Sequence, residues 1–137
     1  MGLGATLFVK NSLEAVEFYK EAFGVTLGSE NMTPVYYPDG TYLHAPLFID
    51  GQEIFDVSEE SRNGKLLELM LASDQRPITS IGINLHSEDK VRKAFNLLAE
   101  GGRVLNLLWT EPWCALGGDV VDKYGVNWFV CCMDDPK

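Results

Sequence analysis

Two stretches of this chain resemble each other: G-Q-E-I-F-D-V at residues 51–57 and G-V-N-W-F-V-C at residues 125–131. Each begins at a glycine and continues as a run of strand-forming residues. Gly51 and Gly125 are 74 residues apart, and aligning them places Phe55 on Phe129. Two serines that precede helical patterns, Ser12 and Ser87, are 75 residues apart. An offset this constant indicates an internal duplication.

Each stretch ends a longer pattern of one strand, one helix and three strands. Helical periodicity predicts a helix over 11–24 and a second helix that Ser87 caps and Gly101 ends. A short β-like run precedes each helix, and the strand candidates that follow are 25–32, 42–49 and 52–57, then 103–108, 116–121 and 127–132. Segment 59–74 fits either a short helix or an extra strand. The sequence predicts an α+β fold: one domain of residues 1–137 made of two βαβββ modules, 1–74 and 75–137.

The composition restricts the classes of partner. The 11 basic and 20 acidic side chains give a formal net charge of -9, which repels phosphate backbones and anionic lipid. We therefore expect no nucleic-acid partner and no membrane association. The beginning of the chain lacks the pattern of a signal peptide, and three cysteines do not form a disulfide framework. Both observations favour a cytoplasmic location, with Cys114, Cys131 and Cys132 as buried free thiols.

Several longer stretches carry a resemblance to a known family. They are L-F-V-K-N-S-L-E-A-V-E-F-Y-K-E-A-F-G, L-H-A-P-L-F-I-D-G-Q-E-I and T-E-P-W-C-A-L-G-G-D-V-V-D-K-Y-G-V-N-W. The chain resembles the vicinal oxygen chelate superfamily, the glyoxalase/bleomycin resistance/dioxygenase group, and within it the PhnB-like branch. The resemblance implies cupped mixed sheets with helices outside, a cavity inside, and a homodimer.

The resemblance also implies a metal site, but this chain departs from it. Metal-dependent members take His or Gln, Glu, His and Glu from the first, fourth, fifth and eighth strands. The matching positions here are Gly4 or Ala5, Phe55, Ser80 and Phe129, and none offers a good ligand atom. A slip of one residue would bring Asp56 into the second position without supplying the other three. We therefore expect no metal and no cofactor, and an apolar cavity instead.

Five residues form the predicted ligand-binding set. Trp109 and Trp113 lie in the loop W-T-E-P-W and suit either the walls of a site or packing in the core or a dimer contact. His44 suits either a polar anchor in the cavity or a histidine hydrogen-bonded within the sheet. Phe55 and Phe129 complete the set as apolar lining.

These residues predict a protein that binds a small organic molecule without the superfamily's metal. A second hypothesis is a lyase, isomerase or dioxygenase with a relocated site built from His44, Asp56 or Cys131. A third is an interaction module whose cavity is filled by its own side chains. The PhnB-like branch is often labelled as a 3-demethylubiquinone methyltransferase, but the chain lacks the Gly-rich turn after a first strand that the usual methyltransferase fold requires.

Overall fold

The computed structural model describes residues 1–133, which fall into two compact units divided between Lys65 and Leu66. The first unit contains β1 (Thr6–Val9), α1 (Ser12–Phe23), β2 (Thr26–Leu27), β3 (Val35–Tyr36), β4 (Tyr42–Ile49), β5 (Gln52–Glu59) and a 3₁₀ turn (Ser61–Asn63). The remaining elements are α2 (Gly64–Ala72), β6 (Ile81–Asn84), α3 (Glu88–Ala99), β7 (Arg103–Glu111), β8 (Cys114–Val121) and β9 (Asn127–Cys132).

The sheet of the first unit has the strand order β1-β5-β4-β2, with β3 pairing with β4 outside this path. Strands β1 and β5 run parallel, and the other pairs are antiparallel. Asp50 and Gly51 connect β4 to β5 with φ angles of 49° and 78°. Positive φ at both turn residues is the geometry of the two-residue hairpin that the Asp-Gly pair predicts.

The sheet of the second unit has the strand order β6-β9-β8-β7. Its parallel pair is β6 and β9, and its other pairs are antiparallel. In both units a helix follows the first strand, and the last strand of the unit pairs with that first strand. Two mixed sheets with few helices confirm the predicted α+β fold class.

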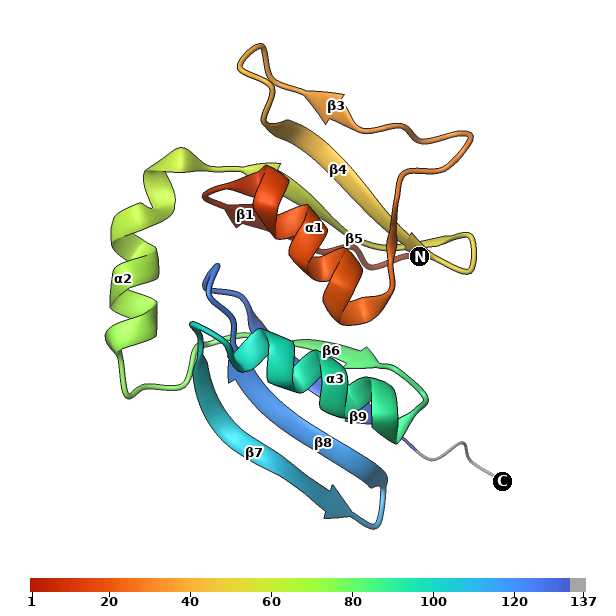
Figure 1. The fold of residues 1–137 in the computed structure, drawn as a ribbon, viewed down its shortest axis with the longest axis vertical. Helices are drawn as coiled ribbons and strands as arrows, with labels where there is room; N and C mark the ends of the chain where they lie inside the picture. The colour runs from red at the N-terminus through yellow and green to blue at the C-terminus, as the bar shows by residue number, and fades with distance from the viewer. Residues whose placement is uncertain (134–137) are drawn as a thin grey trace. The chain divides into compact units, whose positions relative to one another are not determined.

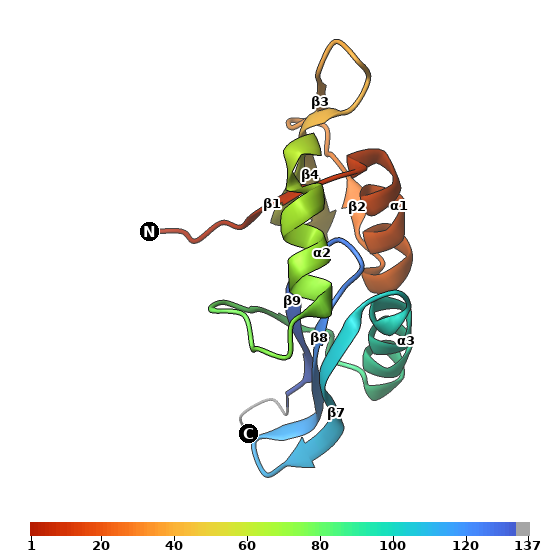
Figure 2. The ribbon, with the colours of Figure 1, turned by 90° about the vertical axis from the view of Figure 1, so that its left-hand side faces the viewer.

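One helix packs on one face of each sheet (Figures 1 and 2). Each helix is amphipathic and turns its buried side chains toward the sheet. In the first unit Leu7 and Val57 pair across β1 and β5 and are buried beneath α1. In the second unit Phe95 of α3 lies against Gly118 of β8, which pairs with the fully buried Val130.

The two helices begin in different ways. Ser87 accepts a hydrogen bond from the backbone N–H of Lys90, which confirms the predicted local cap of α3. The first turn of α1 has no such cap from Asn11. Instead the carboxylate of Glu59, at the end of β5, accepts hydrogen bonds from the N–H groups of Asn11 and Ser12 at 3.1 and 2.8 Å. A residue of a distant strand therefore stabilises this helix end.

Helix α2 occupies most of the segment that the sequence left open. It packs largely with the second unit: the Arg103 guanidinium donates to the Met70 carbonyl at 3.1 Å, and Leu67 lies beside Gly125. For this reason the boundary between the compact units falls within α2. No helix in the described part of the chain is both long and apolar enough to cross a membrane.

Candidate functional site

Each sheet has one face turned away from the helix that packs on it, and we call this its open face. In the second unit the alternation of β9 places Trp128 and Val130 toward α3 and Phe129 on the open face. In the first unit a similar alternation places Val57 toward α1 and Asp56 on the open face. The open faces are where the side chains of a binding site can gather without disturbing the cores.

A β-bulge in β5 determines which residue faces which side. Phe48 pairs with Glu53, whereas the adjacent Leu47 pairs with Phe55, so Ile54 is an extra residue in β5. A bulge of this kind shifts the alternation of side chains along the strand. The pairing of β8 with β9 runs from Val121 to Leu116 without any such shift.

The bulge corrects the alignment of the two repeats. Phe55 is only 3% exposed, and its ring packs edge-on against Tyr19 and Phe23 of α1, with centroid distances of 5.5 and 6.2 Å. Phe55 therefore belongs to the core under the helix rather than to the open face. The residue that corresponds to Phe129 is Asp56, because the inserted Ile54 displaces the sequence alignment by one position.

Two predicted residues meet on the open face of the second unit. The rings of Trp109 and Phe129 are tilted against each other with centroids 6.0 Å apart, and both are half-buried. Glycines adjoin the Phe129 ring: a Cβ atom at Gly117 would lie 3.0 Å from it, and one at Gly82 would lie 3.9 Å from it. The lack of a side chain at Gly117 lets the Phe129 ring lie directly against the backbone of β8. We call the pair of Trp109 and Phe129 the aromatic platform.

A polar group borders the aromatic platform. Asp119 pairs across the strands with Phe129, and its carboxylate accepts a hydrogen bond of 2.9 Å from the Asn106 amide. The Arg76 guanidinium lies 3.7 Å from the same carboxylate. The platform thus combines a flat apolar surface with hydrogen-bonding groups at one side, the combination that orients small organic ligands.

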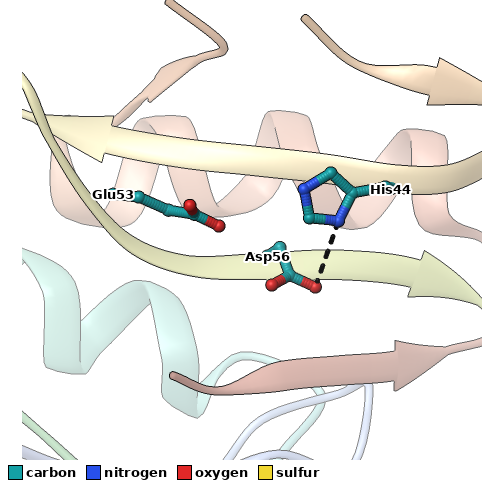
Figure 3. A group of neighbouring side chains, drawn as sticks. All are labelled: His44, Glu53 and Asp56. Carbon is teal, nitrogen blue, oxygen red and sulfur yellow. Dashed lines mark ion pairs between the residues drawn. The ribbon is translucent and has the colours of Figure 1, made fainter. Parts of the chain in front are cut away.

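The open face of the first unit carries a different chemistry. His44 of β4 lies there with Asp56 of β5, and their Nδ1 and Oδ1 atoms are 3.7 Å apart (Figure 3). Glu53, next to the bulge, lies beside them, and one ligand atom from each of the three residues falls within 4.8 Å of the others. All three residues are half-buried.

The remaining predicted residues do not join either group. Trp113 lies in the turn between β7 and β8 and is 55% exposed. Cys131 is buried on the open face of β9, and this burial raises the pKa of its thiol to about 11. A thiol with so high a pKa carries little thiolate at neutral pH and is a poor nucleophile.

An open hollow of about 410 Å³ lies elsewhere in the first unit. It is lined by Tyr37, Pro38, Asp39, Thr41, Glu59, Glu60, Ser61 and Arg62. Its polar groups bond to each other: Asp39 accepts from Thr41, and hydrogen bonds from Arg62 lower the pKa of Glu60 to about 2. None of the five predicted residues lines this hollow, so we place the candidate binding site at the aromatic platform.

Comparison with known proteins identifies the class. A model of the Glyoxalase/Bleomycin resistance protein/Dioxygenase superfamily matches residues 4–130, and the chain belongs to this superfamily. Among solved structures, protein PA1353 from Pseudomonas aeruginosa is 26% identical, with a TM-score of 0.70, over 98% of this chain and 99% of that chain. The PhnB protein from Bacillus cereus is 25% identical, with a TM-score of 0.70, over 96% and 99%. A comparison with curated proteins found no match.

The residues of this chain do not fit the superfamily's four-ligand metal site. The first-strand and fifth-strand positions predicted from sequence lie just outside the strands: Gly4 and Ala5 precede β1, and Ser80 precedes β6. At the level of the expected ligands, Thr6 pairs with Asp56 in the first unit. Gly82 pairs with Phe129 in the second unit. Only Asp56 among these carries a good metal ligand. The donor set disagrees with the superfamily's site even after the repeats are realigned.

Sequence reasoning missed three polar residues of the open faces: Glu53, Asn106 and Asp119. Asn106 and Asp119 lie within predicted strands, and their alternation with apolar neighbours was the available signal for a shared face. Glu53 had no such signal, because its position depends on the bulge at Ile54. Its grouping with His44 and Asp56 required the pairing of β4 with β5.

Proposed function

We propose that this protein binds a small, flat organic molecule on the aromatic platform. Binding would not require the metal ion that other members of the superfamily hold with four protein ligands. The observation that carries the proposal is the half-buried pair of Trp109 and Phe129 with glycines at the neighbouring positions. Aromatic rings stack on flat ligands with offset or tilted geometry, and such contacts contribute about 1 kcal/mol beyond the burial of area.

The polar border favours a ligand with a hydrogen-bonding group at one end. Asn106 and Asp119 are already bonded to each other, and Arg76 supplies a nearby positive charge. A ligand that places its polar end at this border would keep its apolar rings over Phe129. We therefore expect heteroaromatic compounds to bind better than saturated compounds of equal size.

The experiment is a ligand-observed NMR screen with flat heteroaromatic fragments, both neutral and cationic, followed by titration of each hit. Phe129→Ala and Trp109→Ala should weaken binding about tenfold, the loss expected from one stacking contact. Trp113→Ala is the matched control, because it removes an indole from the same hairpin without touching the platform. The proposal fails if no fragment binds, or if Trp113→Ala reduces binding as much as the platform variants do.

The protein is also proposed to form a homodimer. Strand β7 is an edge strand of the described sheet. Leu107 in the middle of β7 is 74% exposed, and Trp113 in the turn after it is 55% exposed. Apolar residues on an unpaired edge favour association with a second chain. Native mass spectrometry should find the dimer, and Leu107→Glu should shift it to the monomer; a monomeric wild-type chain contradicts this assignment.

A cytoplasmic location completes the proposal. The cysteines within residues 1–133 are free, and Cys114 and Cys131 are buried, which suits a reducing compartment. Fractionation of cells that produce the protein at its natural level tests this location, and recovery outside the cytoplasm contradicts it.

A further inference from the structure

We propose that His44, Glu53 and Asp56 form a binding site for a divalent transition-metal ion within the first unit. This site would take one imidazole nitrogen and two carboxylate oxygens from β4 and β5. It shares only the Asp56 position with the superfamily's metal site, because His44 and Glu53 do not lie at the positions of the superfamily's ligands. None of its three residues belongs to the aromatic platform, so metal binding here and organic-ligand binding there are tested by different variants.

Geometry is the first support for the site. One ligand atom from each residue lies within 4.8 Å of the other two, and Figure 3 shows the side chains gathered over the β4–β5 pair. Ligand atoms at about 2.1 Å from a tetrahedral ion are about 3.4 Å apart. Small side-chain rotations can shorten the distances between the ligand atoms to this value. The paired strands hold the Cα atoms of the three residues in place.

The bulge is what brings the third ligand to the group. Strict alternation would place Glu53 on the same side of β5 as Phe55, toward α1. The extra residue Ile54 shifts this alternation, and Glu53 instead lies beside Asp56. Bulges often re-aim side chains next to functional sites.

Electrostatics is the second support. Glu53 and Asp56 place two carboxyl groups close together, and within residues 1–133 neither forms an ion pair with a lysine or an arginine. His44 is the partner of Asp56 in this part of the chain, at 3.7 Å. A bound divalent cation would compensate both carboxylates at once, and the formal net charge of -9 favours cation binding further.

The donor set selects the kind of ion. Imidazole with carboxylates suits Mn²⁺, Fe²⁺ or Zn²⁺, whereas soft ions prefer thiolates. The group contains no cysteine, so it offers no thiolate ligand within the described residues. Three protein ligands leave at least one coordination position for water or a ligand oxygen.

Mn²⁺ is the probe of choice, because it binds thiolates weakly and its free and bound forms differ in electron paramagnetic resonance. The full chain, treated with a chelator and then dialysed, should bind one Mn²⁺ per chain. His44→Ala, Glu53→Gln and Asp56→Asn should each weaken binding at least tenfold. The matched controls are His86→Asn, which removes the chain's other histidine, and Glu17→Gln, which removes an exposed carboxylate.

Folding is measured separately by circular dichroism, and Asp56→Asn and Glu53→Gln keep the shape of the side chains so that the fold is preserved. Binding with the expected stoichiometry and loss in all three site variants would support the site. The proposal is overturned if Mn²⁺ does not bind at millimolar concentration, or if the folded site variants bind it as tightly as His86→Asn does. A variant that combines the three substitutions should lose Mn²⁺ binding, and retention of Mn²⁺ in it would place the ion elsewhere and would equally overturn the proposal.

Discussion

The two units share an order of elements but present opposite chemistry on their open faces. In the second unit β9 runs without a bulge, and Phe129 joins Trp109 on an apolar surface. In the first unit β5 contains the extra residue Ile54, and the corresponding position holds Asp56 beside His44. One inserted residue in one strand therefore separates a surface suited to stacking from one suited to metal ligands.

The hairpin turns before these strands differ as well. Asp50 and Gly51 form a two-residue turn that is stabilised by its own backbone geometry. The turn before β9 is longer and is organised by the buried Asp122. Its carboxylate accepts hydrogen bonds from the N–H groups of Tyr124 and Val126 and from the Trp128 indole, at 2.9, 3.1 and 2.8 Å.

The largest expected effect tests this difference between the turns. Asp122→Ala should lower the free energy of unfolding by about 4 kcal/mol, because it leaves buried donors without their acceptor. Asp50→Ala should cost only about 1 kcal/mol, because alanine tolerates the left-handed conformation at this position less well than aspartate does. Urea unfolding of both variants measures the comparison. Equal losses would show that the two turns are stabilised alike.

The next comparison separates core from open face. Phe55→Ala should cost about 3 kcal/mol, because it leaves a cavity beneath Tyr19 and Phe23. Phe129→Ala should cost about 1 kcal/mol, since its ring is already half in contact with solvent. Thermal and urea unfolding give both values. If Phe129→Ala lowered the free energy of unfolding more than Phe55→Ala does, the placement of Phe55 in the core and Phe129 on the open face would be wrong.

A third comparison uses thiol reactivity on β9. Burial raises the pKa of Cys131 from 9.0 to about 11, so at pH 8 its thiolate fraction falls about 100-fold. Alkylation of Cys131 by iodoacetamide should be slower by that factor than in the unfolded chain. A variant that retains only Cys131 gives the two rates by mass spectrometry, one measured in the folded chain and one in urea.

The same shift predicts a pH dependence. Because the folded pKa of Cys131 lies above the unfolded value, its contribution to stability is complete below pH 9 and is lost as the pH rises toward about 11. Cys131→Ala should flatten the fall in unfolding free energy within this window. Fast alkylation in the folded protein, or an unchanged pH profile in this variant, would show that the thiol is not buried as described.

The smallest expected effect compares the two helix caps. Ser87→Ala removes the local cap of α3 and should cost about 1 kcal/mol. Glu59→Ala removes the two hydrogen bonds that β5 supplies to α1 and should cost a similar amount, about 1 kcal/mol. Glu59→Gln keeps an acceptor and should recover part of the loss. A neutral Glu59→Ala would mean that α1 needs no tertiary cap.

Sequence periodicity predicted the helices and most strands because helix and strand patterns are local. The strand expected over 25–32 is much shorter in the structure: only Thr26 and Leu27 pair with β4, and the chain then turns at Gly28, whose φ angle is 73°. Segment 59–74 could not be assigned because a short apolar run fits both periods. It forms a 3₁₀ turn and α2, with Arg103 bonding to Met70 near its end.

The candidate sites were predicted in part. Trp109 and Phe129 were both chosen from sequence, and the sheet brings them together. His44 and Asp56 were each considered, but their proximity depends on the pairing of β4 with β5. Ligand binding by His44, Phe55, Trp109, Trp113 and Phe129 stays a prediction, with the placement favouring the aromatic pair of the second unit.

By itself, the sequence determined the duplicated α+β fold and the superfamily, because both rest on local periodicity and a repeat that the chain carries in its residues. Only the tertiary structure decided which side chains share a face. Ile54 looks like an ordinary strand residue until its pairing with β4 is seen, and that pairing sets the side of every residue nearby. Register is a property of two strands together, and this is why Asp56, rather than Phe55, faces the open side.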